Sequence, residues 1–103
     1  MTYARTCQLT IEEVPLDNGL TGSLLVNGSG VFSGLTEDDG SHDMLDSDWW
    51  IQAVTSLTDA DGNDVPHTHS GVAIYVSGRD VLNGAGIEVI SDRVDARLCG
   101  GME

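Results

Sequence analysis

The chain has 103 residues and a formal net charge of −13, because 17 aspartates and glutamates face four arginines and no lysine. This length predicts one acidic β domain spanning 1–103. The charge excludes direct binding to nucleic-acid phosphates, which requires cationic side chains, and no apolar run is long enough to cross a membrane.

The first predicted element is a half-buried strand over 3–11. Apolar and polar residues alternate there, and the apolar face consists of Tyr3, Cys7, Leu9 and Ile11. Pro15 ends the strand, and Asp17-Asn18-Gly19 has the composition of a turn.

The next predicted element is a β-hairpin. The apolar segments 23–26 and 31–35 flank Asn27-Gly28-Ser29-Gly30. An Asn-Gly pair between two apolar runs is the strongest short-range hairpin signal, so we expect a tight turn over 27–30.

An exposed loop is expected over 36–48, which holds six acidic residues and only two apolar side chains. The following segment, 49–58, fits one face of a strand and is rich in β-branched residues. A short helix over 47–57, capped by Ser47, is the alternative. We favour the strand.

The last part of the chain again predicts strands. A tight turn over 59–64 leads into a returning strand over 65–77, followed by a loop over 78–86. Two final strands are expected over 87–90 and 93–98. The whole pattern predicts an all-β fold, either a small antiparallel sandwich (immunoglobulin-like or jelly-roll-like) or a barrel of about seven short strands.

The two cysteines lie near opposite ends of the sequence. If the first and last strands are neighbours, Cys7 and Cys99 can form a disulfide. Otherwise they are two buried thiols. Both possibilities remain open.

Two short segments suggest metal ligands. Asp59 and Asp61 lie at alternate positions as in a calcium loop, but the helical calcium motif would need Gly and an acidic residue where Asp64 and Ser70 stand. His67 and His69 lie on the same side of the predicted strand and form an imidazole pair able to bind zinc, copper or iron with a third ligand.

Two resemblances cover parts of this region. Thr58 to Pro66 resembles the hairpin of bacterial immunoglobulin-like repeats, which implies a sandwich. Pro66-His67-Thr68-His69 resembles the first metal motif of the cupin family, in which a Glu and a later His complete the site. This chain has no such Glu and no His after His69, so we expect no cofactor and no catalytic centre.

The strongest candidate for a binding surface is the acidic loop with the adjoining tryptophan pair. Indole rings are common interface anchors, and clustered carboxylates attract Arg and Lys of a partner. The alternative is that one tryptophan belongs to the core and the other partly covers it. The predicted partner-binding residues are Glu37, Asp38, Asp39, Asp43, Asp46, Asp48, Trp49 and Trp50.

These observations predict a non-enzymatic protein of structural, assembly or interaction type, such as a component of a phage or archaeal-virus particle. Its partner would be a basic protein or a second copy of the chain. One alternative is an acidic mimic of nucleic acid that inhibits a host protein, as some anti-CRISPR proteins do, and another is a metal-binding module built on the histidine pair. The acidity itself fits a surface for a basic partner, adaptation to a saline host, or a host whose proteins are generally acidic. No secretion signal is recognised, so we expect a cytoplasmic or virion location.

Overall fold

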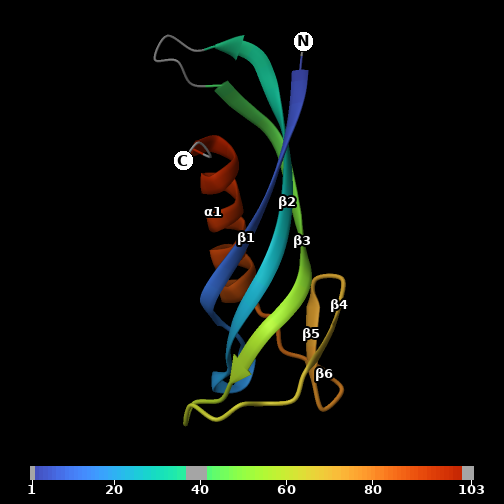
Figure 1. The fold of residues 1–103 in the computed structure, drawn as a ribbon, viewed down its shortest axis with the longest axis vertical. Helices are drawn as coiled ribbons and strands as arrows, with labels where there is room; N and C mark the ends of the chain where they lie inside the picture. The colour runs from blue at the N-terminus through green and yellow to red at the C-terminus, as the bar shows by residue number, and fades with distance from the viewer. Residues whose placement is uncertain (1, 37–41, 101–103) are drawn as a thin grey trace.

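The computed structural model describes residues 2–36 and 42–100 (Figure 1). The strands in this part of the chain are β1 (Thr2–Pro15), β2 (Thr21–Thr36), β3 (His42–Thr58), β4 (Thr68–Ser70), β5 (Ala73–Val76) and β6 (Arg79–Asp80). A 3₁₀ turn, Asp17–Gly19, joins β1 to β2, and the helix α1 spans Gly84–Gly100.

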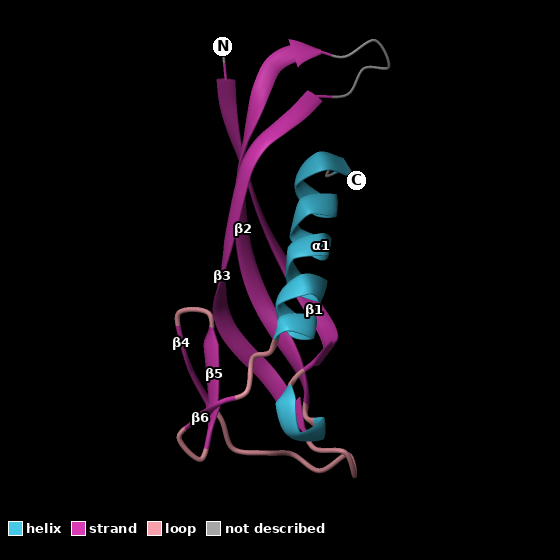
Figure 2. Ribbon diagram, turned by 180° about the vertical axis from the view of Figure 1, so that it is seen from behind, coloured by secondary structure: helices cyan, strands magenta, loops and turns pink. Residues whose placement is uncertain are grey.

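The architecture is mainly β, as predicted, but the described chain forms neither a sandwich nor a barrel. It contains two three-stranded antiparallel sheets, ordered β1-β2-β3 and β4-β5-β6. The helix α1 lies along one face of the larger sheet (Figure 2). The predicted set of short strands is wrong because β1, β2 and β3 are 14, 16 and 17 residues long. These long strands and the helix give an elongated molecule of 49 × 21 × 20 Å.

The strand predicted over 3–11 is confirmed, and it continues through a bulge. Ile11 pairs with Leu24 and Val14 pairs with Gly22, so two glutamates lie opposite one residue of β2. Glu13, in the bulge, has a φ of 57°. The extra residue turns both Ile11 and Val14 into the core, where each is fully buried.

The hairpin turn predicted over 27–30 is wrong, because these residues lie in the middle of β2 and pair with both neighbouring strands. Gly28 and Gly30 have no positive φ. Both positions require glycine because a side chain would not fit beneath α1. A Cβ on Gly28 would lie 2.5 Å from Val94 Cγ1, and a Cβ on Gly30 would lie 3.1 Å from Leu98 Cδ1. The two glycines therefore let α1 pack close to the sheet.

The two strands predicted over 87–90 and 93–98 are also wrong, since α1 spans this region. Alternating apolar residues suggested a strand, but Ile90, Val94 and Leu98 are four residues apart and all buried, as on one face of a helix. Asn83 is the N-cap, because its Oδ1 accepts a hydrogen bond from the Gly86 backbone N at 2.8 Å.

The strand predicted over 49–58 is confirmed as part of β3, and the alternative helix over 47–57 is wrong. The loop predicted over 36–48 is wrong at both ends, because Thr36 belongs to β2 and 42–48 belong to β3. Residues 37–41 lie outside the described residues. Three residues of β3 have no paired residue in β2, and each forms a bulge: Leu45, Gln52 and Thr55.

The turn over 59–64 is confirmed, and an isolated bridge between Thr58 and Asp64 closes it. The single returning strand predicted over 65–77 is wrong. The chain instead folds into the small sheet β4-β5-β6, and β6 occupies part of the predicted loop over 78–86.

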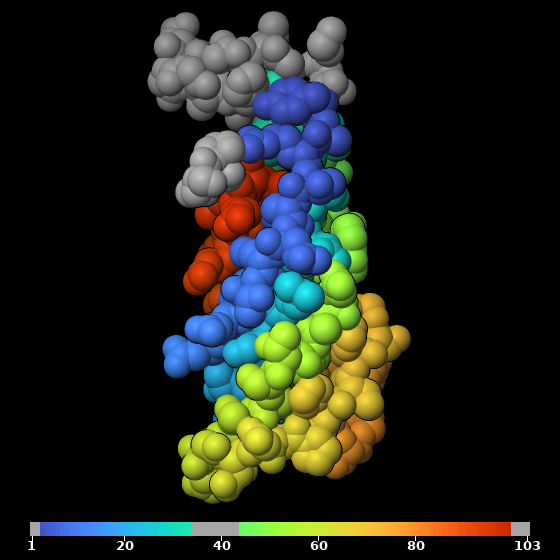
Figure 3. Space-filling view, viewed as in Figure 1, coloured from blue at the N-terminus to red at the C-terminus, as the bar shows by residue number. Residues whose placement is uncertain are grey.

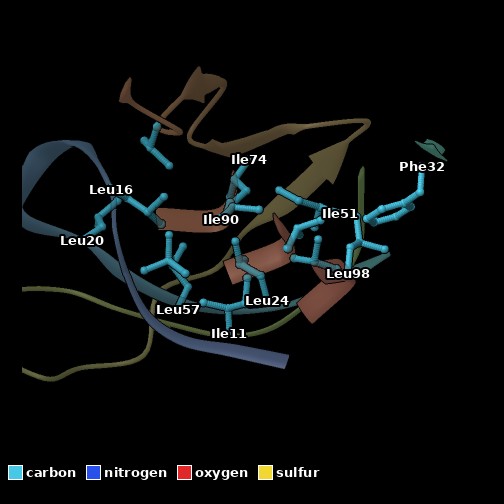
Figure 4. Close-up of a cluster of buried hydrophobic side chains, with 14 residues drawn as sticks. Ile11, Leu16, Leu20, Leu24, Phe32, Ile51, Leu57, Ile74, Ile90 and Leu98 are labelled. Carbon is cyan, nitrogen blue, oxygen red and sulfur yellow. The ribbon is translucent and has the colours of Figure 1, made fainter. Parts of the chain in front are cut away.

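One hydrophobic core joins these elements (Figure 4). Ile74 of the small sheet and Ile90 of α1 belong to the same cluster as Leu24 and Leu57 of the large sheet. The small sheet is therefore packed into the fold rather than attached as an independent unit.

We predict that Gly28→Ala lowers the free energy of unfolding by about 1–3 kcal/mol, because the new methyl group overlaps Val94. Ser29→Ala, on the opposite face of β2, should change it by no more than about 0.5 kcal/mol. Denaturant unfolding at fixed salt measures both. In the double variant Gly28→Ala/Val94→Ala, the loss of unfolding free energy should be smaller than the sum of the two single losses, because the Val94 methyl groups that meet the new Cβ are absent. Strict additivity would contradict the close packing of α1 on β2.

Candidate functional site

The face of the large sheet turned away from α1 is the most extended candidate site. The three strands lie side by side on it with no helix over them (Figure 3). Side chains in register point to the same face, which gives four cross-strand rows. These rows are Thr10–Leu25–Ala53, Gln8–Asn27–Trp50, Thr6–Ser29–Asp48 and Ala4–Val31–Asp46. We call them together the open face.

The tryptophan pair is split between the two faces of the sheet. Trp49 pairs with Gly28 beneath α1, packs against the core, and donates a hydrogen bond from Nε1 to Ser91 Oγ at 3.0 Å. Trp50 is on the open face and is 46% exposed. The two rings therefore do not form one surface: Trp49 faces α1 and Trp50 faces solvent.

Three amide side chains lie beside Trp50 on the open face. Gln8 Nε2 donates to Asn27 Oδ1 at 3.0 Å and to Gln52 Oε1 at 2.8 Å. Asn27 Nδ2 donates to the same Gln52 oxygen at 2.8 Å. Each strand of the sheet contributes one member of this amide cluster. Nothing in the sequence pattern singled these residues out, because they come from three distant segments.

Two of the predicted partner-binding acids lie on the open face. Asp46 and Asp48 are two residues apart on β3, in the rows of Val31 and Ser29. Each carboxylate accepts one hydrogen bond from the next backbone N–H, Ser47 N at 2.9 Å and Trp49 N at 2.8 Å. A carboxylate has further lone pairs, so both can still accept from a guanidinium group.

The other predicted partner-binding acids are placed less fully. Glu37, Asp38 and Asp39 lie outside the described residues. Asp43 lies in β3, but its side chain is not described.

The acidic residues grouped together in the sequence separate along the molecule. Asp46 and Asp48 lie in the first half of β3, whereas the acids of the turn over 59–64 follow its last residue, at the other end of this 17-residue strand (Figure 1). Trp50 therefore has Asp46 and Asp48 as its acidic neighbours rather than the acids of that turn.

The candidate metal ligands Asp59 and Asp61 lie in the turn after β3. Asp59 Oδ1 accepts hydrogen bonds from the backbone N of Asp61 and of Asn63, each at 2.9 Å. These bonds, the one from Asn63 above all, hold the pKa of Asp59 below its ordinary value. The side chain of Asp59 thus organises the turn, as in an Asx-turn.

The candidate ligands His67 and His69 are both half-buried. Both ring nitrogens of His67 face backbone carbonyl oxygens: Nδ1 is 3.0 Å from Val65 O and Nε2 is 3.4 Å from Val54 O. His69 is in β4, paired with Ile74. Within residues 2–36 and 42–100, no three His, Cys, Asp or Glu side chains come together as a metal site.

Two open hollows flank His67. The larger, of about 450 Å³, is lined by Pro66, His67, Thr68, Tyr75, Ser77 and Gly78. The smaller, of about 240 Å³, is lined by Thr55, Ser56, Leu57, Asp64, Val65 and His67. Ser77 and Gly78 form the turn between β5 and β6 and both have positive φ, 53° and 78°. That pattern is typical of a two-residue hairpin turn and explains their conformation without a ligand.

The two cysteines are free thiols rather than a disulfide. Cys7 is half-buried under α1, and this burial raises the pKa of its thiol. Cys99 is exposed in the last turn of α1. A disulfide is expected only if the first and last strands are neighbours, and that condition fails because Cys99 lies on α1 rather than on a strand.

Among the described residues, α1 is the one long helix, and it lacks the apolar length needed to cross a membrane.

The split of the tryptophan pair predicts unequal effects on stability. Trp49→Ala should lower the free energy of unfolding by about 3 kcal/mol, because it removes core packing and leaves Ser91 without its donor. Trp50→Ala should lower it by less than about 1 kcal/mol. Thermal or denaturant unfolding measures both variants. Equal losses would contradict the placement of the two rings on opposite faces.

The hydrogen bonds to Asp59 predict a pH-dependent contribution to stability. A carboxyl with a lowered folded-state pKa stabilises the fold above its unfolded value, 3.8, and loses that effect as pH falls through the folded value. Asp59→Ala should therefore be less stable than the natural chain at neutral pH, with the gap narrowing below pH 3.8.

Denaturant unfolding between neutral and acidic pH tests this prediction. Asp61→Ala is the control, because Asp61 contributes its backbone N rather than its side chain to these bonds. A gap between Asp59→Ala and the natural chain that does not change with pH would contradict the prediction.

Comparison of this chain with protein-family models, with curated proteins and with solved structures found no match. The chain's own surfaces therefore carry the functional argument.

Proposed function

We propose that this protein is a non-enzymatic interaction or assembly domain that binds a basic segment of a partner protein on its open face. The observation that carries this proposal is the exposed Trp50 on an uncovered sheet face that also holds Asp48 and Asp46, two and four residues before it on β3. Trp50 supplies the anchor and the two carboxylates supply the charge that selects Arg or Lys.

The anchor has the chemistry of an interface hot spot. Trp is enriched at such positions because a rigid indole buries a large area at a small cost in conformational entropy. Val31, 40% exposed on the same face, adds apolar area along the neighbouring strand. A guanidinium group can stack on the exposed indole ring while it hydrogen-bonds to Asp48.

The surroundings of Trp50 are fixed before a partner arrives. Gln8, Asn27 and Gln52 hold one another through hydrogen bonds of 2.8–3.0 Å across the three strands. Side chains that are already ordered lose little entropy on binding, so this polar floor favours docking of an extended segment.

The charge of the whole chain supports a basic partner. A net charge of −13 without a single lysine attracts cationic segments from a distance and speeds their association. This attraction is screened by salt, so the affinity falls as ionic strength rises. An assembly partner in a virus-like particle and a basic host protein both meet these requirements.

The proposal is tested by titrating the ¹⁵N-labelled full chain with an arginine-rich peptide at several salt concentrations. We expect saturable shifts at the indole N–H of Trp50 and the amides of Asp46 and Asp48. The indole N–H of Trp49, which is bonded to Ser91, is the internal control. Trp50→Ala should weaken binding at least about tenfold, and Asp46→Asn/Asp48→Asn should flatten the salt dependence.

Val72→Ala is the matched control variant, because Val72 is as exposed as Trp50 but lies in the turn between β4 and β5. It should leave the affinity unchanged. Shifts spread equally over the turn 59–64, with Trp50 silent, would refute docking on the open face and favour a general polyanion such as a nucleic-acid mimic.

A further inference from the structure

We infer that two copies of this chain pair through the outer edges of their β1 strands, forming one antiparallel six-stranded sheet. The outer edge of β1 is the margin of the open face farthest from β3, and the pairing uses its backbone groups, so it does not depend on the proposed docking at Trp50. Three features of β1 support this pairing: its continuous register with β2, its lack of acidic residues over 2–11, and a sequence that is complementary to itself in an antiparallel pair.

The two edge strands of the large sheet differ in how they are protected. Within the described chain, β1 and β3 each pair with β2 as their one strand neighbour. The edge of β3 is interrupted by bulges, and its lower part is covered by the chain after the turn, through Val65 N donating to Leu57 O at 2.9 Å. Bulges, coverage and charged side chains are among the devices by which proteins prevent strand addition.

Among the described residues, neither a bulge nor a covering strand protects the edge of β1 over its first ten residues, and Arg5 is the one charged side chain there. Its register with β2 is continuous from Thr2 to Ile11, and the first bulge comes at the glutamates that follow. A long regular edge strand turns alternate N–H and C=O groups outward, where another strand can pair with them.

The charge distribution favours a second copy at this edge. The segment 2–11 contains no acidic residue and one cation, Arg5, in a chain of net charge −13. The upper part of β3 carries Asp43, Asp46 and Asp48 instead. Two copies approaching through 2–11 therefore bring no carboxylate of this segment into the contact, and salt screens the repulsion between the rest of the two chains.

The pattern of β1 is complementary to itself about Thr6, which is what a twofold interface requires. An antiparallel pair centred there sets no like charges directly opposite each other, leaves the two Arg5 residues as diagonal neighbours, and matches Thr with Thr and Tyr with Leu. The pairs are Thr2 with Thr10, Tyr3 with Leu9, Ala4 with Gln8, Arg5 with Cys7, and Thr6 with Thr6 of the other copy. Leu9 and Cys7 are half-buried at the margin of the core, so the second copy would complete their burial.

This pairing and the proposed partner docking respond to salt in opposite directions. Docking of a basic segment weakens as salt rises, because the attraction is screened. Pairing of two anionic copies strengthens, because their repulsion is screened. Failure of one proposal is therefore distinguishable from failure of the other.

Cysteine cross-linking of the full chain tests the pairing, in a background with Cys7→Ser and Cys99→Ser. Thr6→Cys places the new thiols across the twofold axis, so mild oxidation in high salt should give a covalent dimer. Ala4→Cys is the matched control, because its two thiols would lie about 13 Å apart along the strands, beyond disulfide reach. Thr6→Cys should cross-link at least about tenfold faster than Ala4→Cys.

A mixture of Ala4→Cys and Gln8→Cys chains supplies the second readout. These positions face each other in the proposed register, so mixed dimers should form although neither variant cross-links with itself. Light scattering should show the natural chain shifting from monomer to dimer as salt rises. A monomer at every salt concentration, or Ala4→Cys cross-linking as fast as Thr6→Cys, would overturn the inference.

Discussion

The close approach of α1 to the middle of β2 is the constraint on which the rest of the fold depends. Gly28 and Gly30 present no side chains there, and Val94 and Leu98 of the helix fill the space above them. Any larger residue would push the helix away from the sheet and open the core that both elements share. One helix is enough to cover one face of three strands. The other face therefore stays exposed to solvent, and this is the face on which we place the binding function.

The alternation of side chains along each strand then places them either on the buried face beneath α1 or on the solvent-exposed open face. Trp49 and Trp50 are adjacent in sequence, yet one donates to Ser91 of α1 and the other is exposed on the open face. The same rule separates Gly28, beneath the helix, from Asn27, which joins the amide cluster. Gly28 beneath the helix and Asn27 beside Trp50 are thus consecutive positions of β2 that face opposite sides of the sheet.

The acidic residues are distributed so that the centre of the sheet stays neutral. No acidic residue occurs in β2, and those of β3 lie in its first seven residues. A chain of net charge −13 thereby keeps both a strand edge free of acidic residues over 2–11 and a charged open face near Trp50. The two proposed contacts oppose each other in their salt dependence, so ionic strength would set which of them dominates.

The sequence by itself determined the mainly β class, the strand of β1, the strand over 49–58 and the turn at Asp59. Each of these is encoded locally, by alternation or by side chains that bond their own backbone. Strand alternation over 49–58 also separates Trp49 from Trp50, in line with the alternative in which one tryptophan belongs to the core. The role of Gly28 and the helical state of 84–100 were decided only by the tertiary structure. An Asn-Gly pair has the same sequence whether the glycine is needed for a positive φ in a turn or for its lack of a Cβ in a strand. Only the helix packed against Gly28 distinguishes the two cases.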